Sequence, residues 1–337
     1  ADILVSVFTH NTRATISENS ARAYESLASK IADAAAAKSF SGIATCTGTV
    51  AACGDAFVAD FAKRAFRRPL TAEEKTNYLT FFSSSLGVST TSDALKLALR
   101  AIFTSPQFLY RSEMGVKVAD LRAGTVDSSA NISINDIPST DRTALPDTAY
   151  VLTQYEIASF LAFTYTGSTP DATLLAAADS KSLWTKAQID TQVTRLLATT
   201  KARQHFGNFA VQWLDAEGLP YDARDPARYP TYTTDVQKSM LEEVRAIYND
   251  VLLDGAPFAN LYSSSYTFAN QALINFYGLS GSAGSAVQKV NTTNRGGLLA
   301  SGAFTARNAH FAKTAPVIRA VRTRRSFLCH DVPNPPT

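Results

Sequence analysis

The sequence predicts a mainly α-helical protein, a multi-helix, bundle-like architecture with long irregular loops and at most a small hairpin. Apolar residues recur at every third or fourth position along most of the chain, which is the period of an amphipathic helix. Three capping boxes of the form Thr-x-x-Glu or Thr-x-x-Gln precede such runs. No segment alternates apolar and polar residues strongly enough to predict a sheet, and no internal repeat is found.

Residues 1–114 are expected to form an N-terminal helical region. Its helices are predicted by three apolar stripes: Ala23, Leu27, Ile31 and Ala34; Phe57, Phe61 and Ala65; and Leu95, Leu99, Ile102 and Phe103. The second of these helices must end by Pro69, because proline lacks the amide donor that a helix interior needs. Thr71 and Glu74 form the first capping box.

Residues 115–150 break the helical pattern and are expected to be a linker or irregular loop. The segment is rich in Ser, Asp, Thr and Pro, and loops of this length are usually functional or linkers. Within it, residues 118–137 are expected to hold at most a short hairpin. The segment is therefore the best internal boundary of the chain.

A central helical domain is expected over residues 151–285, followed by a C-terminal helical segment with a proline-rich tail over residues 286–337. Capping boxes at Thr153 and Thr185 start two of the helices. The remaining helices are predicted by stripes of Phe206, Phe209, Ala210 and Trp213, and of Val236, Met240, Val244, Ile247 and Val251. A last helix is expected from Pro316, because proline suits the first helical turn.

The composition argues against several classes of protein. With 32 basic and 29 acidic residues in 337, the formal net charge is +3, whereas a nucleic-acid binder usually shows a concentrated basic excess. No run of about 18 apolar residues is present, so no transmembrane segment is expected. With four histidines and three cysteines, no metal site is predicted. No catalytic motif is recognised, so whether the protein is an enzyme stays open.

Cys46 and Cys53 lie seven positions apart, and the small residues between them allow a tight loop. We expect a disulfide between them, which would imply an oxidising compartment; two unpaired thiols are the alternative. The low content of charged residues also favours a secreted, periplasmic or cell-surface protein. Cys329 is left over, and the chain closes on the proline-rich residues 331–337. We therefore expect a fragment or processed subunit that meets other chains, or missing parts of its precursor, at both termini.

Several strings resemble a bacterial family of secreted proteins found in planctomycetes and myxobacteria. Residues 61–71, with both cysteines just upstream, resemble the domain of unknown function 1595, which would begin at about residue 46. The strings that resemble domain 1592 are residues 105–113, 155–158, 170–171, 203–214 and 266–278. The strings that resemble domain 1588 are residues 295–299, 314–319 and 328–329.

Many members of this family carry c-type haem, so the resemblance implies a part of a larger cytochrome-associated redox protein or complex. The flanking domains of the family are absent here. The chain also lacks the Cys-x-x-Cys-His motif. The resemblance therefore implies no cofactor in this chain itself, and a haem c on a missing segment or on a partner chain.

Two groups of residues are candidates for a binding site. His310 could be an axial ligand or proton carrier beside a missing segment, or a loop histidine bonded to the backbone. Four arginines fall within seven positions, and they cannot all be paired at low cost. We expect this cluster to bind an anion, such as a haem propionate, phosphate or an acidic polysaccharide. Structural pairing of the arginines with acidic residues is the alternative. These arginines are Arg319, Arg322, Arg324 and Arg325.

A second basic cluster, formed by Arg64, Arg67 and Arg68, is interpreted as structural, with the arginines capping helix ends and pairing with nearby acids. Three function classes remain. The first is a redox-associated protein, and the second is a non-catalytic extracellular structural or assembly subunit. The third is a polysaccharide-acting enzyme that would use Glu156 or Glu242. No catalytic residue can be assigned among them.

Overall fold

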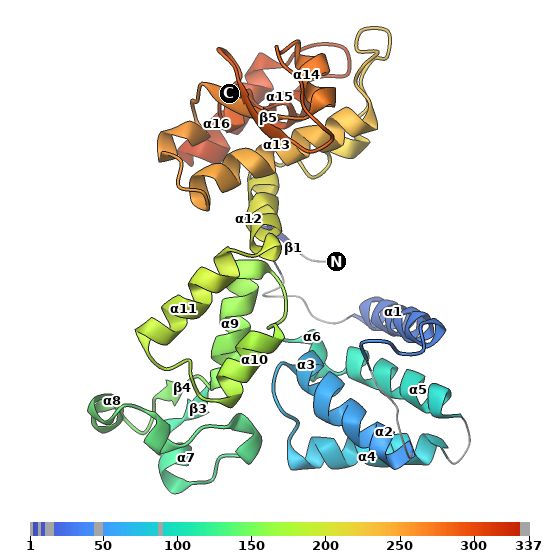
Figure 1. Ribbon diagram of the computed structural model, residues 1–337, viewed down its shortest axis with the longest axis vertical. Coiled ribbons are helices and arrows are strands. Elements are labelled where there is room, and N and C mark those ends of the chain that lie inside the picture. The colour runs from blue at the N-terminus through green and yellow to red at the C-terminus, as the bar shows by residue number, and fades with distance from the viewer. Residues whose placement is uncertain (1–2, 6–7, 11–16, 44–49, 87–89, 331–337) are drawn as a thin grey trace, which may run out of the picture. The chain divides into compact units, whose positions relative to one another are not determined.

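The computed structural model describes residues 3–5, 8–10, 17–43, 50–86 and 90–330, and most of these residues are helical (Figure 1). The mainly α fold class is therefore confirmed. The chain divides into two compact units: unit 1 lies within residues 14–196, and unit 2 combines residues 2–13 with 197–337. None of the described helices is long and apolar enough to cross a membrane.

The first part of unit 1 is a small helical bundle. Its elements are α1 (Glu18–Ala37), α2 (Val50–Ala56), the π-helical turn η1 (Phe57–Ala62), α3 (Lys63–Phe66), α4 (Ala72–Leu86), α5 (Thr91–Thr104) and α6 (Pro106–Leu109). Helix α5 packs against both α1 and α4. Phe57, Phe82, Leu99 and Ile102 are almost completely buried between the helices and form the centre of this core.

Helix α1 buries a different face from the predicted one. Leu27 and Ile31 of the expected stripe are 55% and 37% exposed, whereas Ala28, Ala32 and Ala35 are buried. The reason is steric: alanine side chains let α1 lie close against α5, and the bulkier residues are displaced to the outer face. The predicted stripe was therefore wrong, although the helix itself was right.

Residues 116–151 form a compact insertion with its own small core. Strands β3 (Val116–Lys117) and β4 (Tyr150–Val151) pair antiparallel, with Val116 opposite Val151. Between them lie α7 (Val118–Ala123), the 3₁₀ turns η2 (Ser128–Ala130) and η3 (Ile134–Asp136), and α8 (Ser139–Ala144). The stretch 118–137 thus forms short helical turns and no hairpin. Leu121, Ile132 and Ile137 are buried together, which orders a segment without sequence periodicity.

Unit 1 closes with α9 (Gln154–Thr166), α10 (Ala172–Asp179) and α11 (Lys186–Leu197). The three predicted capping boxes are confirmed. In each, the backbone N–H of the first residue donates to the side chain of the fourth, at 2.8 to 2.9 Å, and the reverse bond measures 3.1 to 3.3 Å. These boxes pair Thr71 with Glu74, Thr153 with Glu156 and Thr185 with Gln188.

Unit 2 is built around α13 (Thr234–Leu252), which packs against α12 (Thr200–Trp213), β5 (Tyr266–Ala269), α14 (Gln271–Tyr277) and α15 (Gly302–Arg307). Strand β5 pairs antiparallel with β6 (Gln288–Asn291). The other elements of the unit are β1 (Ile3–Val5), β2 (Phe8–His10), η4 (Leu219–Tyr221), η5 (Phe258–Leu261), η6 (Leu298–Ala300) and α16 (Pro316–Leu328). Met240, Leu273 and Leu298 lie in its core and are at most 2% exposed.

The predicted disulfide falls partly outside the described residues, because Cys46 is not among them. Cys53 is buried, and Cys329 is an exposed free thiol at the end of α16. We expect alkylation of the unfolded but unreduced protein to modify Cys329 alone, and alkylation after reduction to modify all three cysteines. Intact mass spectrometry before and after reduction measures this difference. Three adducts without reduction would contradict the disulfide.

Candidate anion-binding site

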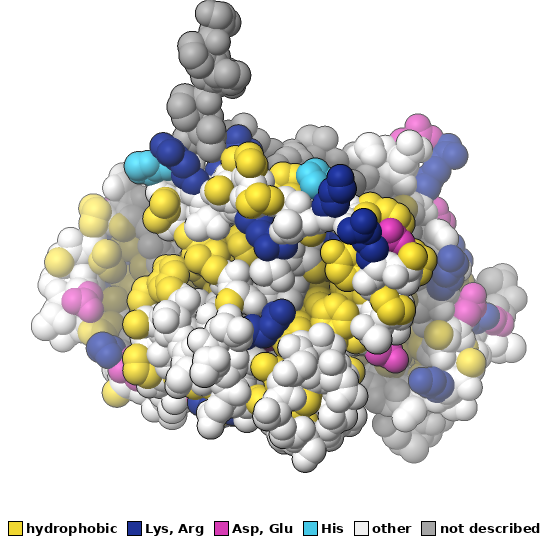
Figure 2. Space-filling view, turned by 90° about the horizontal axis from the view of Figure 1, so that it is seen from above, with side chains coloured by type: hydrophobic (Ala, Val, Ile, Leu, Met, Phe, Trp, Pro, Cys, Tyr) yellow, Lys and Arg dark blue, Asp and Glu magenta, His cyan; other side chains and the backbone are white. Residues whose placement is uncertain are grey.

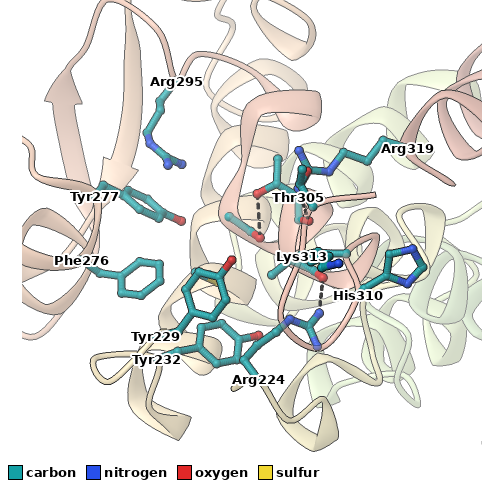
Figure 3. Close-up of a pocket in the computed structure, with 15 residues that line it drawn as sticks. Arg224, Tyr229, Tyr232, Phe276, Tyr277, Arg295, Thr305, His310, Lys313 and Arg319 are labelled. Carbon is teal, nitrogen blue, oxygen red and sulfur yellow. Dashed lines mark hydrogen bonds between the residues drawn. The ribbon is translucent and has the colours of Figure 1, made fainter. Parts of the chain in front are cut away.

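Unit 2 contains a pocket of about 140 Å³ that lies between the loop before α13, helices α14 and α15, and the start of α16 (Figure 3). Two types of side chain dominate its lining. The basic ones are Arg224, Arg295, His310, Lys313 and Arg319. The aromatic ones are Tyr229, Tyr232, Phe276 and Tyr277. We refer to this feature as the basic pocket.

The four permanent cations of the basic pocket have no acidic partner among the described residues. Arg224 donates to the carbonyl oxygens of Ala223, at 2.8 Å, and Ala306. Arg319 donates one bond to Thr305 O at 3.0 Å. Backbone carbonyls orient these guanidinium groups but carry no full negative charge, so none of the four cations is held in a direct ion pair within the described part of the chain.

Two aspartates of the same unit, Asp215 and Asp222, are paired with arginines that do not line the basic pocket. Asp222 accepts both bonds of a fork from Arg307, at 3.0 and 3.1 Å, and Asp215 lies 2.6 Å from Arg322. In the view of Figure 2, basic side chains are interspersed with hydrophobic ones over the middle of the face, with few acidic side chains among them. The lining of the pocket itself contains five basic residues and no Asp or Glu.

The aromatic side chains hold two of the arginines in place. The Arg295 guanidinium lies over the ring of Tyr277 with its carbon 3.9 Å from the ring centroid, and the Arg224 guanidinium lies 5.8 Å from that of Tyr232. Phe276 packs between these two rings, with centroid separations of 5.8 and 6.0 Å. Such stacking restricts the guanidinium planes, and at Arg295 it leaves the N–H groups at the edge available to an anion.

A buried carboxylate supports the wall of the basic pocket from behind. Glu243 is completely buried and accepts three hydrogen bonds, from Thr267 Oγ1 at 2.6 Å, Tyr277 Oη at 2.7 Å and Gly302 N at 3.0 Å. Burial raises the pKa of the Glu243 carboxyl, and it also raises the pKa of the Tyr277 hydroxyl, well above its usual range. Glu243 thus fixes the ring on which Arg295 rests.

Two glycines are needed where the backbone comes close to this wall. A Cβ on Gly302 would lie 1.9 Å from the Tyr277 hydroxyl, and a Cβ on Gly296 would lie 1.8 Å from the carbonyl oxygen of Ser264. Only glycine fits at such separations. The Arg-Gly-Gly sequence at 295–297 therefore lets the loop approach closely and places Arg295 at the pocket.

The loop before α16 brings the last basic residues to the basic pocket. His310 N donates to Lys313 O at 2.9 Å, and Ala309 pairs with Thr314 across this tight turn. Pro316 then occupies the first turn of α16, as the sequence predicted, and Arg319 follows one turn later. The turn and the helix start together place His310, Lys313 and Arg319 on one side of the pocket (Figure 3).

The structure separates the residues that the sequence grouped together. Of the four arginines on the last helix, only Arg319 lines the basic pocket, together with His310. Arg322 pairs with Asp215, and Arg324 and Arg325 are exposed. Sequence reasoning missed Arg224, Arg295 and Lys313 as site residues, because nothing local shows that the chain brings them together with His310 and Arg319. The Arg-Gly-Gly string was the signal that could have pointed to Arg295.

The second basic cluster has the structural role that the sequence indicated. Arg67 donates to four backbone carbonyls, those of Ala65, Gln107, Phe108 and Tyr110, at 2.7 to 3.3 Å. Arg68 makes two bonds of 2.8 Å to Glu74. A pocket of about 130 Å³ next to these arginines also touches Glu156, but Glu156 is occupied by the amides of Thr153, Met114 and Gly115. The charged side chains of this second pocket are thus engaged in structural contacts, Arg67 with backbone carbonyls and Arg68 with Glu74.

The carboxylates considered for polysaccharide cleavage are engaged in structural contacts. Glu156 closes the capping box of α9, and its Oε1 accepts the amides of Met114 and Gly115. Glu242 lies 2.8 Å from Arg245 on the exposed side of α13. Glycosidases need two carboxylates facing one another across a cleft, and neither residue lines the basic pocket. The structure therefore offers no geometric support for that alternative at the basic pocket.

Comparison with protein-family models finds two matches, the second of which spans the end of unit 1 and the first part of unit 2. Residues 53–113 match the model of a protein of unknown function, DUF1595, and residues 152–279 match that of a second, DUF1592. The chain contains a DUF1595 domain and a DUF1592 domain. No curated protein and no solved structure matches the chain. The DUF1592 match includes Arg224, the four aromatic residues of the basic pocket and Glu243, whereas Arg295 to Arg319 follow it.

The basic pocket does not fit a haem group. Cofactor sites usually measure about 300–1,000 Å³, which is more than twice the volume found here. His310 lies on an exposed turn and its backbone is bonded to Lys313. The sequence also lacks the attachment motif for haem c.

Proposed function

We propose that the C-terminal unit of this chain is a ligand-binding module that holds an anionic ligand in the basic pocket. The observation that carries this proposal is the set of four cations around one pocket, none of which has an acidic partner among the described residues. A partly buried cation loses hydration, and the few carbonyl contacts of Arg224 and Arg319 offset only part of this loss. An anionic ligand would provide that compensation through charge-assisted hydrogen bonds.

The wider setting that we propose is a secreted or periplasmic bacterial protein associated with c-type cytochromes. The support for this setting is the resemblance in the sequence, including the strings similar to domain 1588 near the C-terminus. A Soret absorption band in the natively purified complex is the expected observation. A colourless complex without bound iron would overturn the cytochrome association and would leave the anion site as a separate question.

Neutralising single cations of the basic pocket is expected to weaken anion binding about tenfold or more for each residue, because a hydrogen bond to a charged group contributes about 1.5–3 kcal/mol. The variants are Arg295→Gln and Lys313→Gln. The measurement is isothermal titration of the protein with inorganic phosphate and with benzoate. Binding to the wild type should also weaken at high salt, since ions screen exposed charges.

Lys238→Gln is the matched control for these two variants. Lys238 is an exposed lysine on α13, and it does not line the basic pocket. Its replacement removes the same charge from the same unit and should leave the affinity unchanged within a factor of two. If Lys238→Gln weakens binding as much as Lys313→Gln, or if neither these two anions nor a di- or tricarboxylate binds to the wild type at millimolar concentration, the proposal is wrong.

A further inference from the structure

We propose that the ligand of the basic pocket is a single six-membered ring that carries two or more acidic groups. This inference rests on the proposed function and adds the ligand class to it. Three features of the pocket carry it: its volume, its aromatic wall, and the placement of its cations on two sides. Each feature constrains a different part of the ligand.

The volume of the basic pocket and its aromatic wall both favour a ligand that contains one ring. A cavity of about 150 Å³ is known to accept one benzene molecule, and the basic pocket measures about 140 Å³. Phe276 and Tyr232 present neighbouring rings to the pocket, with centroids 6.0 Å apart, and Tyr229 also lines it near Tyr232. Flat apolar faces of this kind pack well against an aromatic ring or against the apolar face of a sugar. A chain-like ligand would leave most of this surface uncovered.

The placement of the cations favours a ligand that carries at least two acidic groups. Figure 3 shows Arg295 beside Tyr277 at one side of the pocket, whereas Lys313 and Arg319 lie across from it. A ligand with an acidic group facing each of these two sides matches the arrangement better than one with a single acidic group. A single negative charge would also leave most of the four cations uncompensated. Two acidic groups at separate positions of the ring meet both sides.

The cations on the two sides of the basic pocket are held in place to different degrees. Arg295 is held flat on Tyr277, and Tyr277 is in turn fixed by Glu243, so the Arg295 fork is oriented before a ligand arrives. On the other side, Arg319 uses one nitrogen for Thr305 O, and its Nε is buried without a hydrogen-bond partner. Lys313 is exposed and can adjust its position. The fixed side would orient the ligand, and the mobile lysine would add charge.

A matched series of ligands tests this inference by titration calorimetry. Benzoate, isophthalate and trimesate share one ring and carry one, two and three carboxylates, whereas glutarate carries two without a ring. We expect isophthalate to bind at least tenfold more tightly than both benzoate and glutarate. A sulfated glucuronate and its unsulfated parent form a second pair, which distinguishes an acidic sugar from an aromatic acid as the source of the ring.

Arg295→Gln should remove the preference for two acidic groups, so that isophthalate and benzoate bind this variant with affinities within a factor of three. Lys313→Gln serves as the second variant if Arg295→Gln does not fold, and circular dichroism melting checks both. If benzoate or glutarate binds the wild type as tightly as isophthalate, the inference is wrong and the proposed function stands. If none of the compounds and no inorganic phosphate binds, the proposed function itself fails.

Discussion

Replacing Glu243 with alanine is expected to lower the free energy of unfolding of unit 2 by about 3–5 kcal/mol, which is the range found when one partner of a buried charged network is removed. The Glu243 carboxylate is the acceptor for Thr267, Tyr277 and the amide of Gly302, and all three donors would lose their partner in the interior. The cavity left behind adds to the loss. Urea denaturation followed by the fluorescence of Trp213, in a Trp184→Phe background, reports on unit 2 alone.

Glu243→Gln is the control that separates hydrogen bonding from charge. Its amide oxygen can still accept from Tyr277 and Gly302, and its amide nitrogen can donate to the oxygen of Thr267. We therefore expect Glu243→Gln to retain most of the stability that Glu243→Ala loses. Equal losses in the two variants, or a loss below about 1 kcal/mol in the alanine variant, would contradict the role assigned to the network.

Replacing Arg67 with alanine should destabilise unit 1 by about 2–4 kcal/mol, because four backbone carbonyls lose charged hydrogen bonds at once and these contributions are not additive. Arg67 is 7% exposed and ends α3 in a left-handed conformation with φ 61°. Alanine suffers the same backbone strain as arginine at this position, so the difference reports on the side chain. The measurement is urea denaturation followed by Trp184 fluorescence in a Trp213→Phe background.

The neighbouring Arg64 provides the comparison. Its side chain is 43% exposed and pairs with Asp60 one helical turn away, so Arg64→Ala should change stability by less than about 1 kcal/mol. Arg67→Lys should recover only part of the loss, since one ammonium group cannot reach four carbonyls in the geometry of the guanidinium fork. A loss in Arg67→Ala no larger than that in Arg64→Ala would show that the buried contacts are not stabilising.

Helix starts could be predicted because their signals are local. The capping boxes at Thr71, Thr153 and Thr185 form between residues three positions apart, and no distant part of the chain is needed to make them. The apolar stripe of α5 is buried as predicted, with Leu95, Leu99 and Ile102 at most 2% exposed. Its side chains are large enough to decide by themselves which face meets the core.

The face of α1 could not be predicted for the opposite reason. Alanine gains little from burial, so an alanine-rich helix has no strong preference until a neighbour is present. Helix α5 then selects the side with Ala28, Ala32 and Ala35 because small side chains allow a close approach. The order within residues 116–151 has the same origin, since Leu121, Ile132 and Ile137 meet only after the chain has folded back.

The sequence by itself determined the helical class, the helix starts, the two domain families and two members of the basic pocket, His310 and Arg319. Tertiary structure alone decided that Arg224, Arg295 and Lys313 join them. It also decided that Arg322 is neutralised by Asp215 and so is not available to a ligand. The physical reason is that the sequence shows only how many charged residues there are, whereas binding depends on which of them remain unpaired after folding. Pairing is set by distances between residues about 100 positions apart, and only the folded chain fixes those distances.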